Sequence, residues 1–436
     1  MITPHFPPDS NAGTHRVRLL APYLEANRWI PSVLTVDPSF YEGSLDEGLA
    51  ALVPSKLNVI RAKAIPPGLT RLLGFGDLGL RSFVGLYRRA RELLSKEHHD
   101  LIYITVYPTY TALIGPLLKR KFRIPFVLDY QDPWVGAWGE LVGGGRNGKV
   151  DLKSRISRIV ASKLEPIGVK AADAITAVSR KIGEDAIERV RPHHPIPVVE
   201  IPIGGDTRDF DLAQSVQTNF LFDSRDGFFH IVCIGTVLPL GFETLRAFLQ
   251  AVAQVRTRNP ELYQSLRIHF VGTGNKRTPD RELRVVPIAR ELGIADILSE
   301  YPERVDYLDS VRLHLHASAI LLLGSSEHHY TASRLYPALL SGRPILAVYH
   351  RLSTVSQILC ESDRDEVWLV QFDEEKPVAS RVPEIMEVLL RLRDQAITAR
   401  QITSRRIRED LLAPHLGATL ASLFDRIAGE DALNRS

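Results

Sequence analysis

The residues with the most suggestive chemistry lie near the end of the chain, in the stretch "HHYTASRLYPALLSGRPILAV" at 328–348. The pattern predicts a helix from Ser333 to Gly342, followed by the apolar strand "ILAV". Hydroxyl groups and Arg334 gather where this helix begins. One interpretation is helix capping, because Ser333 can accept a hydrogen bond from a backbone N–H. The other is an anion site, in which Arg334 and the amides of the first turn hold a phosphate.

Polar residues also follow a predicted strand in the first half of the chain. The segment "VLDYQDPW" at 127–134 ends a buried strand with Asp129 and Asp132. A carboxylate at a strand end can act as a base or can accept a hydrogen bond from a hydroxyl group. A simpler interpretation of Asp132 is a turn residue, since a proline follows it. Both interpretations are open at this stage.

Two further loops have the composition of a phosphate-binding region. The segment "TPHFPPDSNAGTHR" at 3–16 runs through small residues into a helix that is expected to start near Thr14. The segment "VGTGNKR" at 271–277 ends a strand with Lys276 and Arg277. Small residues allow a backbone to approach a phosphate closely, and the two cations suit its charge. Arg277 also fits a solvated surface position.

These loops are positioned by strands that alternate with helices along almost the whole chain. The strand-like runs lie at 31–36, 100–106, 124–130, 174–179, 197–202, 228–235, 266–274, 318–325 and 366–372. Alternation of this kind predicts parallel sheets covered by helices, and ligands then bind beyond the carboxyl ends of the strands. The pattern restarts after residue 227. We therefore expect two doubly wound Rossmann-like domains facing a cleft.

The expected domains are 1–205 and 206–402, with C-terminal helices at 403–436 that cross back towards the first domain. The net charge of +3 over 436 residues argues against a nucleic-acid binder. The sequence contains no apolar run of membrane-spanning length, and it has two cysteines. Its three histidine pairs lack the spacing of a metal site, so no metal is expected. The cytoplasm is the expected location.

The chain resembles glycosyltransferase family 4, whose members have the two-domain GT-B fold. The resemblance is carried, in order, by "HFPPDSNAGTHRVRLLAPYLEANRWIPSVLT", "IPFVLDYQDPW", "ADAITAVS", "IPIGGDTRDF", "IHFVGTG" and "YTASRLYPALLSGRPILAV". It implies transfer of a sugar from a nucleotide-diphosphate sugar, usually with retention and without a metal or other cofactor. The second domain would hold the nucleotide, and the first would hold an acceptor, which in many such enzymes is lipid-linked.

The resemblance and the loop chemistry together give an expected site. Asp132, with Asp129 beside it, is the catalytic candidate. The leaving diphosphate gains negative charge as the glycosidic bond breaks, and fixed donors stabilise that charge. The expected substrate-binding residues are Gly13, Thr14, Arg16, Thr236, Gly272, Gly274, Lys276, Arg277, Glu327, His329, Thr331, Ser333, Arg334, Leu335 and Tyr336.

The sequence departs from the family at two functional positions. Many members carry two glutamates with seven residues between them, where this chain has His329 and Pro337, and Glu327 is the nearest substitute. A nucleotide-sugar 2-epimerase, or a degenerate protein that only binds a nucleotide sugar, therefore stays as an alternative. The segments 80–94 and 153–166 place Arg and Lys beside apolar faces. They predict either peripheral contact with the inner face of a membrane or, more simply, core-facing helices with a solvated basic edge.

Overall fold

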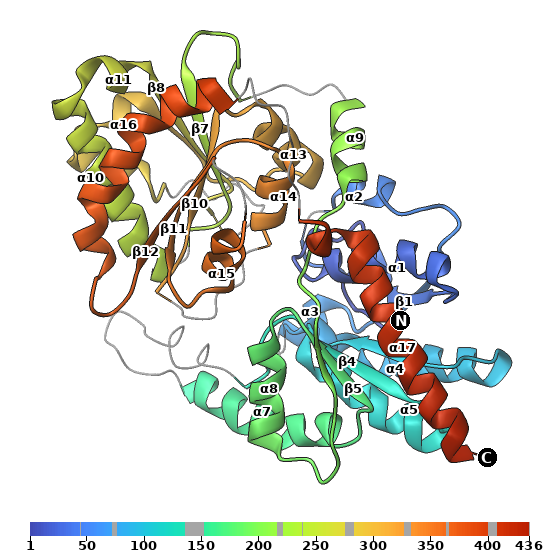
Figure 1. The fold of residues 1–436 in the computed structure, drawn as a ribbon. Helices are drawn as coiled ribbons and strands as arrows, with labels where there is room; N and C mark the ends of the chain where they lie inside the picture. Colours follow the sequence, from blue (N-terminus) through green and yellow to red (C-terminus); the bar gives the residue numbers. More distant parts are fainter. Residues whose placement is uncertain are drawn as a thin grey trace. The chain divides into compact units, whose positions relative to one another are not determined.

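The structure is a computed structural model that describes residues 1–43, 45–71, 76–135, 152–215, 221–237, 239–274, 283–326, 333–362, 366–399 and 408–435 (Figure 1). These residues form two compact units. Unit 1 comprises Met1–Gly204 and Ala413–Ser436, and unit 2 comprises Gly205–Leu412. The stretch before Ala413 belongs to unit 2 because the backbone N–H of Gly205 donates to the carbonyl of Leu411 at 3.1 Å.

A parallel sheet forms the centre of unit 1. Its strands are β1 (Ser32–Val36), β2 (Asn58–Ala62), β3 (Ile102–Thr105), β4 (Phe126–Tyr130), β5 (Ala174–Ala177) and β6 (Val198–Glu200). Ile2 connects the β1–β2 pair to the other four strands, because it bridges in parallel to both Leu34 and Ile104. The spatial order is β2, β1, Ile2, β3, β4, β5, β6. Ile2 therefore stands where the first strand of a dinucleotide-binding sheet lies.

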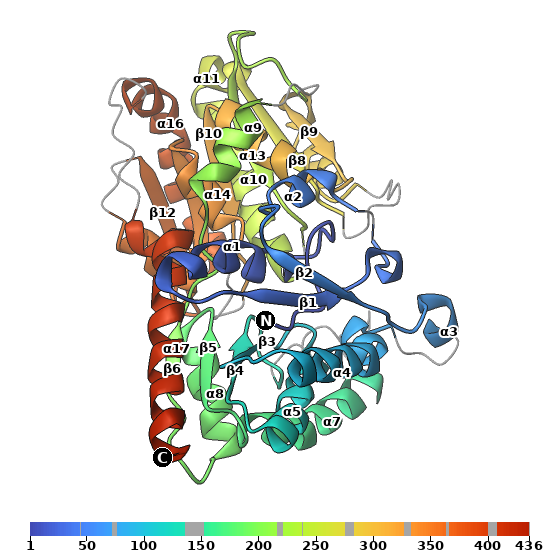
Figure 2. The ribbon, with the colours of Figure 1, turned by 90° about the vertical axis from the view of Figure 1, so that its right-hand side faces the viewer.

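Helices cover both faces of this sheet (Figure 2). On one face, α1 (Thr14–Leu24) packs against the C-terminal helix α17 (Ala413–Arg435), and Leu20 and Phe424 share a core with Val33. On the other face lie α4 (Leu78–Lys96), α5 (Ile114–Phe122), α7 (Leu152–Val169) and α8 (Arg180–Val190). The short helices α2 (Glu47–Ala51) and α3 (Pro67–Arg71) flank β2 in the sequence.

Unit 2 has a six-stranded parallel sheet. Its strands are β7 (Phe229–Ile234), β8 (Leu266–Val271), β9 (Leu298–Tyr301), β10 (Ala319–Leu323), β11 (Ile345–His350) and β12 (Val367–Phe372). Their spatial order is β12, β11, β10, β7, β8, β9. Counted along the chain from the β9 edge, this order is 3-2-1-4-5-6, which is that of the dinucleotide-binding fold. The chain changes direction across the sheet between β7 and β10.

The helices of unit 2 are α9 (Thr207–Ser215), α10 (Phe242–Arg258), α11 (Pro260–Ser265), α12 (Val286–Glu291), α13 (Tyr307–His316), α14 (Leu335–Leu340), α15 (Thr354–Cys360) and α16 (Val382–Ala399). α10 packs against α16, and their apolar residues share a core with one face of the sheet. α13 contacts α9 and α14. No helix among the described residues is both long and apolar enough to cross a bilayer.

The predicted fold class is confirmed: both units are parallel α/β layers with helices on the sheet. Two strands were not predicted. β2 and β9 lie at sheet edges and mix polar with apolar residues, so they lack the continuous apolar run of a strand buried on both faces. The helix expected from Ser333 to Gly342 is shorter in the structure, where α14 runs from Leu335 to Leu340.

Candidate functional site

In unit 2, Arg334 lies where the direction of the chain changes across the sheet. Its Nη1 donates to the carbonyl of Ile234, the last residue of β7, at 3.3 Å. Its Nη2 donates to the carbonyl of Leu323, the last residue of β10. The guanidinium therefore spans the carboxyl ends of the two strands that flank the switch point. In open α/β sheets this crevice is where ligands bind.

The backbone beside Arg334 is adapted to the guanidinium. Gly235 follows β7 with a φ of +125°, which favours glycine. A Cβ at this position would lie 2.8 Å from Arg334 Nη1. Burial raises the pKa of the neighbouring Cys233 thiol to about 11, although the charge of Arg334 acts in the opposite direction. Arg334 is thus a fixed positive charge at the strand ends.

The loops after β7 and β8 are hydrogen-bonded to each other. Thr236 Oγ1 donates to the carbonyl of Gly274 at 3.2 Å, and the N–H of Val237 donates to the carbonyl of Thr273 at 3.1 Å. Gly272 has a φ of +72°. Three of the expected binding residues, Thr236, Gly272 and Gly274, therefore lie together at the carboxyl end of the sheet.

The start of α14 differs from the expectation. Arg334, and not Ser333, is the N-cap residue, and its side chain makes no capping hydrogen bond. The N–H of Tyr336 donates to the carbonyl of Ser333 at 3.4 Å, and the side chains of Leu335 and Tyr336 are buried. A helix of six residues also has few aligned peptide dipoles. The cation of Arg334 is thus the main feature here that suits an anion.

Five of the expected binding residues lie outside the described residues. They are Lys276, Arg277, Glu327, His329 and Thr331.

In unit 1, the loop that follows Ile2 brings His5 and Asp9 together. His5 Nδ1 contacts Asp9 Oδ2, and both side chains are nearly buried. The imidazole also packs beside the rings of Tyr107 and Tyr41, with centroid distances of 5.6 and 6.4 Å. A carboxylate on Nδ1 favours the tautomer whose Nε2 accepts a hydrogen bond. The i, i+4 spacing of His5 and Asp9 was the only sequence signal, and the prediction missed it.

Tyr107 and Asp132 follow neighbouring strands, β3 and β4, at the carboxyl ends of these strands. Asp132 is exposed. Burial raises the pKa of the Tyr107 phenol, and the negative charge of Asp132 raises it further. Gly13 packs against the Tyr107 ring so closely that a Cβ would lie 2.6 Å from it. His5, Tyr107 and Asp132 therefore form one polar group at the carboxyl ends of the unit 1 strands.

Gly13 and Thr14 begin α1 as expected, but their amides already have acceptors. The N–H of Gly13 donates to Asn11 Oδ1 at 3.2 Å, and the N–H of Thr14 donates to the carbonyl of Asn11 at 3.0 Å. Thr14 Oγ1 is buried and makes no hydrogen bond within the described part of the chain. A phosphate that approaches these amides would have to displace Asn11.

The structure places the side chains of Asp129 and Arg16 inside the core of unit 1. Both side chains are completely buried. Arg16 Nε and Nη2 donate to the Asp129 carboxylate at 2.7–3.0 Å, Arg16 Nη1 donates to the carbonyl of Pro202 at 2.8 Å, and Thr176 Oγ1 donates to Asp129 at 2.7 Å. With every group satisfied inside the core, this pair connects α1 to β4 and to the chain after β6. It is a structural ion pair.

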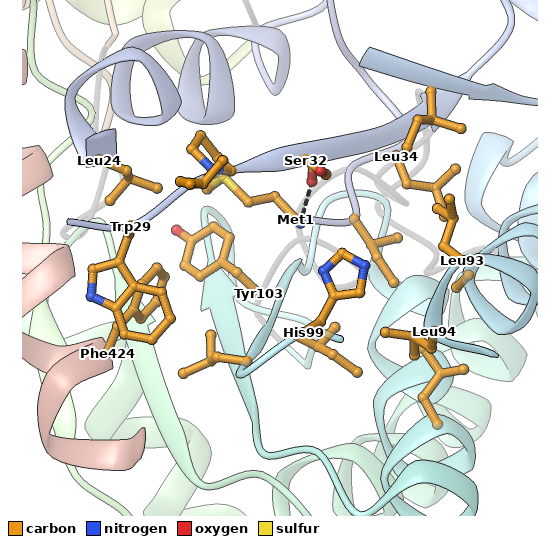
Figure 3. Close-up of a pocket in the computed structure, with 18 residues that line it drawn as sticks. Met1, Leu24, Trp29, Ser32, Leu34, Leu93, Leu94, His99, Tyr103 and Phe424 are labelled. Carbon is orange, nitrogen blue, oxygen red and sulfur yellow. Dashed lines mark hydrogen bonds between the residues drawn. The ribbon is translucent and has the colours of Figure 1, made fainter. Parts of the chain in front are cut away.

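An apolar pocket in unit 1 lies near the amino ends of β1 and β3, and its lining includes Ser32 and Ile102 (Figure 3). The lining also includes Trp29, His99, Tyr103 and Phe424. The Met1 amine donates to the carbonyl of Ser32, the first residue of β1, at 2.7 Å, and burial lowers the pKa of this amine to about 5. Because ligands of parallel sheets bind at the carboxyl ends of the strands, we do not place the expected substrate site in this pocket.

Residues 11–202 match the family model of the glycosyl transferase 4-like domain. The chain therefore contains a glycosyl transferase 4-like domain in unit 1. The match spans most of unit 1, including Tyr107 and Asp132. No curated protein sequence matches the transferase significantly.

Solved structures share the fold of the transferase over almost its full length. Anabaena HepE in complex with UDP and glucose is 14% identical with a TM-score of 0.53, and the match covers 99% of this chain and 97% of that one. The N-terminal domain of Candida albicans trehalose-6-phosphate phosphatase is 14% identical, with a TM-score of 0.58 and coverage of 98% and 96%. A Listeria monocytogenes protein assigned as a UDP-N-acetylglucosamine 2-epimerase is 12% identical, with a TM-score of 0.54 and coverage of 98% and 96%. At these identities the likeness concerns the GT-B fold.

Proposed function

We propose that the transferase moves a sugar from a nucleotide-diphosphate sugar to a hydroxyl group of a glycan, lipid-linked or small-molecule acceptor. The observation that carries the donor assignment is the position of Arg334 between the carboxyl ends of β7 and β10. A guanidinium suits the oxygens of a diphosphate, because its planar N–H groups can form paired charge-assisted hydrogen bonds. Anabaena HepE, which shares the fold, binds UDP.

The charge of Arg334 acts on the leaving group in this proposal. When the bond between the anomeric carbon and the phosphate oxygen breaks, the electron pair stays on the diphosphate. A cation that is already held in place stabilises this charge without reorganisation during the reaction. The proposal includes retention at the anomeric carbon and independence from a metal ion, both of which are implied by the resemblance to family 4.

The polar group of His5, Tyr107 and Asp132 is the proposed binding site for the sugar acceptor. His5, oriented by Asp9, offers Nε2 as a hydrogen-bond acceptor for an incoming hydroxyl. Asp132 is exposed beside Tyr107 and keeps its proposed role as a hydrogen-bond acceptor or a base. Asp129 has no part in the chemistry in this proposal, because its carboxylate is enclosed by Arg16 and Thr176.

Release of nucleoside diphosphate from a panel of sugar nucleotides tests the proposal. We expect slow release with one donor, and faster release when its acceptor is added. The Arg334→Ala variant is expected to lose this activity. The matched control is Arg267→Ala in the same unit, since Arg267 lies at the amino end of β8, where it covers the ring of Phe228 at 3.5 Å. Equal activity of the two variants would refute the role of Arg334.

A 2-epimerase is the second candidate, supported by the shared fold of the Listeria protein. The same incubations separate the two reactions. An epimerase converts the sugar of the nucleotide into its C2 epimer, which proton NMR detects, and this conversion needs no acceptor. A degenerate binding protein would give neither product, although it would still bind the nucleotide.

A further inference from the structure

Three helices of unit 1 form a continuous layer whose outer side is unusually apolar. α5 packs between α4 and α7 and contacts both (Figure 2). The inner side of the layer is buried against the sheet through residues such as Leu86 of α4, Leu118 of α5 and Val169 of α7. The outer side is defined by the exposed residues of these helices, and we refer to it as the outer face.

α7 contributes an apolar stripe to the outer face. Ile156, Ile159 and Ile167 are 53%, 56% and 53% exposed, and Val160 and Lys163 lie between them on the same side of the helix. Their spacing of three, four, seven and eleven residues places all five on one face. An ordinary core-facing helix has polar residues on this side, so the simpler interpretation of the segment 153–166 does not account for the stripe.

The neighbouring helices extend the apolar surface. Leu117 of α5 and Leu80 and Val84 of α4 are also exposed. The described residues include thirteen exposed large apolar side chains, and seven of them lie on these three helices. This concentration sets the outer face apart from the scattered apolar residues of an ordinary surface.

The charges on the outer face have one dominant sign. Arg88 and Arg91 of α4, Arg120 and Lys121 of α5, and Lys163 of α7 are exposed. Within the described side chains of α5 and α7 the acidic residue is Glu165, which is buried and bonded to Arg189. Glu92 of α4 is paired with Arg89 and Lys96. The outer face is therefore both apolar and basic.

We propose that the outer face docks on a bilayer surface that contains anionic lipid. Aliphatic side chains can enter the boundary between headgroups and acyl chains, while arginine and lysine bind the phosphates around them. A second copy of the chain is a poorer partner, since a two-fold contact would bring like charges together. The inference is independent of the donor site in unit 2, and it selects a lipid-linked acceptor among the classes proposed above.

Vesicle sedimentation of the full chain tests the inference, with phosphatidylcholine vesicles and phosphatidylcholine–phosphatidylglycerol vesicles. We expect binding to the anionic vesicles that weakens with added salt. The triple variant Ile156→Ser, Ile159→Ser, Ile167→Ser should lower the partition coefficient by at least about tenfold, because three insertable side chains are lost. Lys163→Glu should also lower it. The control is Leu352→Ser, whose side chain is 44% exposed on unit 2.

The possible results distinguish a bilayer surface from a second copy of the chain as the partner of the outer face. Because all substituted side chains are exposed, each variant should keep the wild-type urea midpoint. Each should also keep the wild-type release of nucleoside diphosphate from the sugar nucleotide when the acceptor is soluble. Equal sedimentation of the triple variant and the Leu352 control would overturn the proposal, as would absence of binding to anionic vesicles at low salt. Light scattering that finds a dimer, abolished by the triple variant, would assign the outer face to self-association instead.

Discussion

Asp129→Ala is expected to destabilise unit 1 strongly without removing a catalytic group. The substitution leaves the guanidinium of Arg16 in a site where its side chain is completely buried. Removing one partner of a buried ion pair costs about 3–5 kcal/mol, because the remaining charge loses its compensation. The hydroxyl of Thr176 also loses its acceptor at 2.7 Å. For a domain of this size the loss corresponds to a fall in Tm of roughly 6–20 °C.

Urea unfolding followed by tryptophan fluorescence measures this effect, since unit 1 contains three of the four tryptophans of the chain, Trp29, Trp134 and Trp138. The matched control is Asp132→Ala. Asp132 lies three residues further along and is exposed, so its removal should leave the midpoint unchanged and lower turnover by about a hundredfold. In the double variant Arg16→Met, Asp129→Leu, both charges are absent and much of the lost stability should return.

The opposite pattern would refute the reasoning. If Asp129→Ala keeps the wild-type midpoint and loses turnover, Asp129 acts in the chemistry, as its place after a buried strand first indicated.

Three further predictions concern other parts of the molecule. His5→Ala should lower acceptor-dependent turnover by about tenfold or more and leave donor hydrolysis unchanged, whereas loss of both activities would contradict an acceptor role. Gly235→Ala should weaken nucleotide binding in calorimetry, since the new Cβ would displace Arg334; unchanged affinity would show that the guanidinium adapts. Burial lowers the pKa of His314 to about 4, so the fold holds it neutral. Its contribution to stability is complete above the ordinary value of 6.5 and is lost as pH falls towards 4, by about 2 kcal/mol at pH 5. His314→Leu should remove this part of the pH dependence in urea unfolding, and an unchanged dependence would contradict the burial of a neutral imidazole.

The fold was predictable because most strands are buried on both faces. Runs such as "AILLL" of β10 are apolar throughout, which gives a strong signal. β9, "LSEY", lies at a sheet edge and gives none. The first strand position of unit 1 also gives a weak sequence signal. In the structure this position is occupied by Ile2, which forms isolated parallel bridges and no longer strand.

The candidate site was less predictable, because a sequence does not reveal which polar residue faces inward. Asp129 alternates with Leu128 and Tyr130, so its side chain points to the face of β4 that packs against α1. Its partner on that helix is Arg16, which lies 113 positions earlier in the sequence. That pairing depends on tertiary structure. Arg334 was predicted as an anion-binding residue, but its place across β7 and β10 follows from strand order, which no local pattern encodes.

We propose that nucleoside diphosphate binds unit 2 at the strand ends held by Arg334. Isothermal titration calorimetry of the full chain with UDP, GDP and ADP measures it most directly. We expect binding of at least one of the three, a loss of about tenfold or more in affinity for Arg334→Ala, and wild-type affinity for Arg267→Ala. Wild-type affinity in Arg334→Ala would contradict the claim.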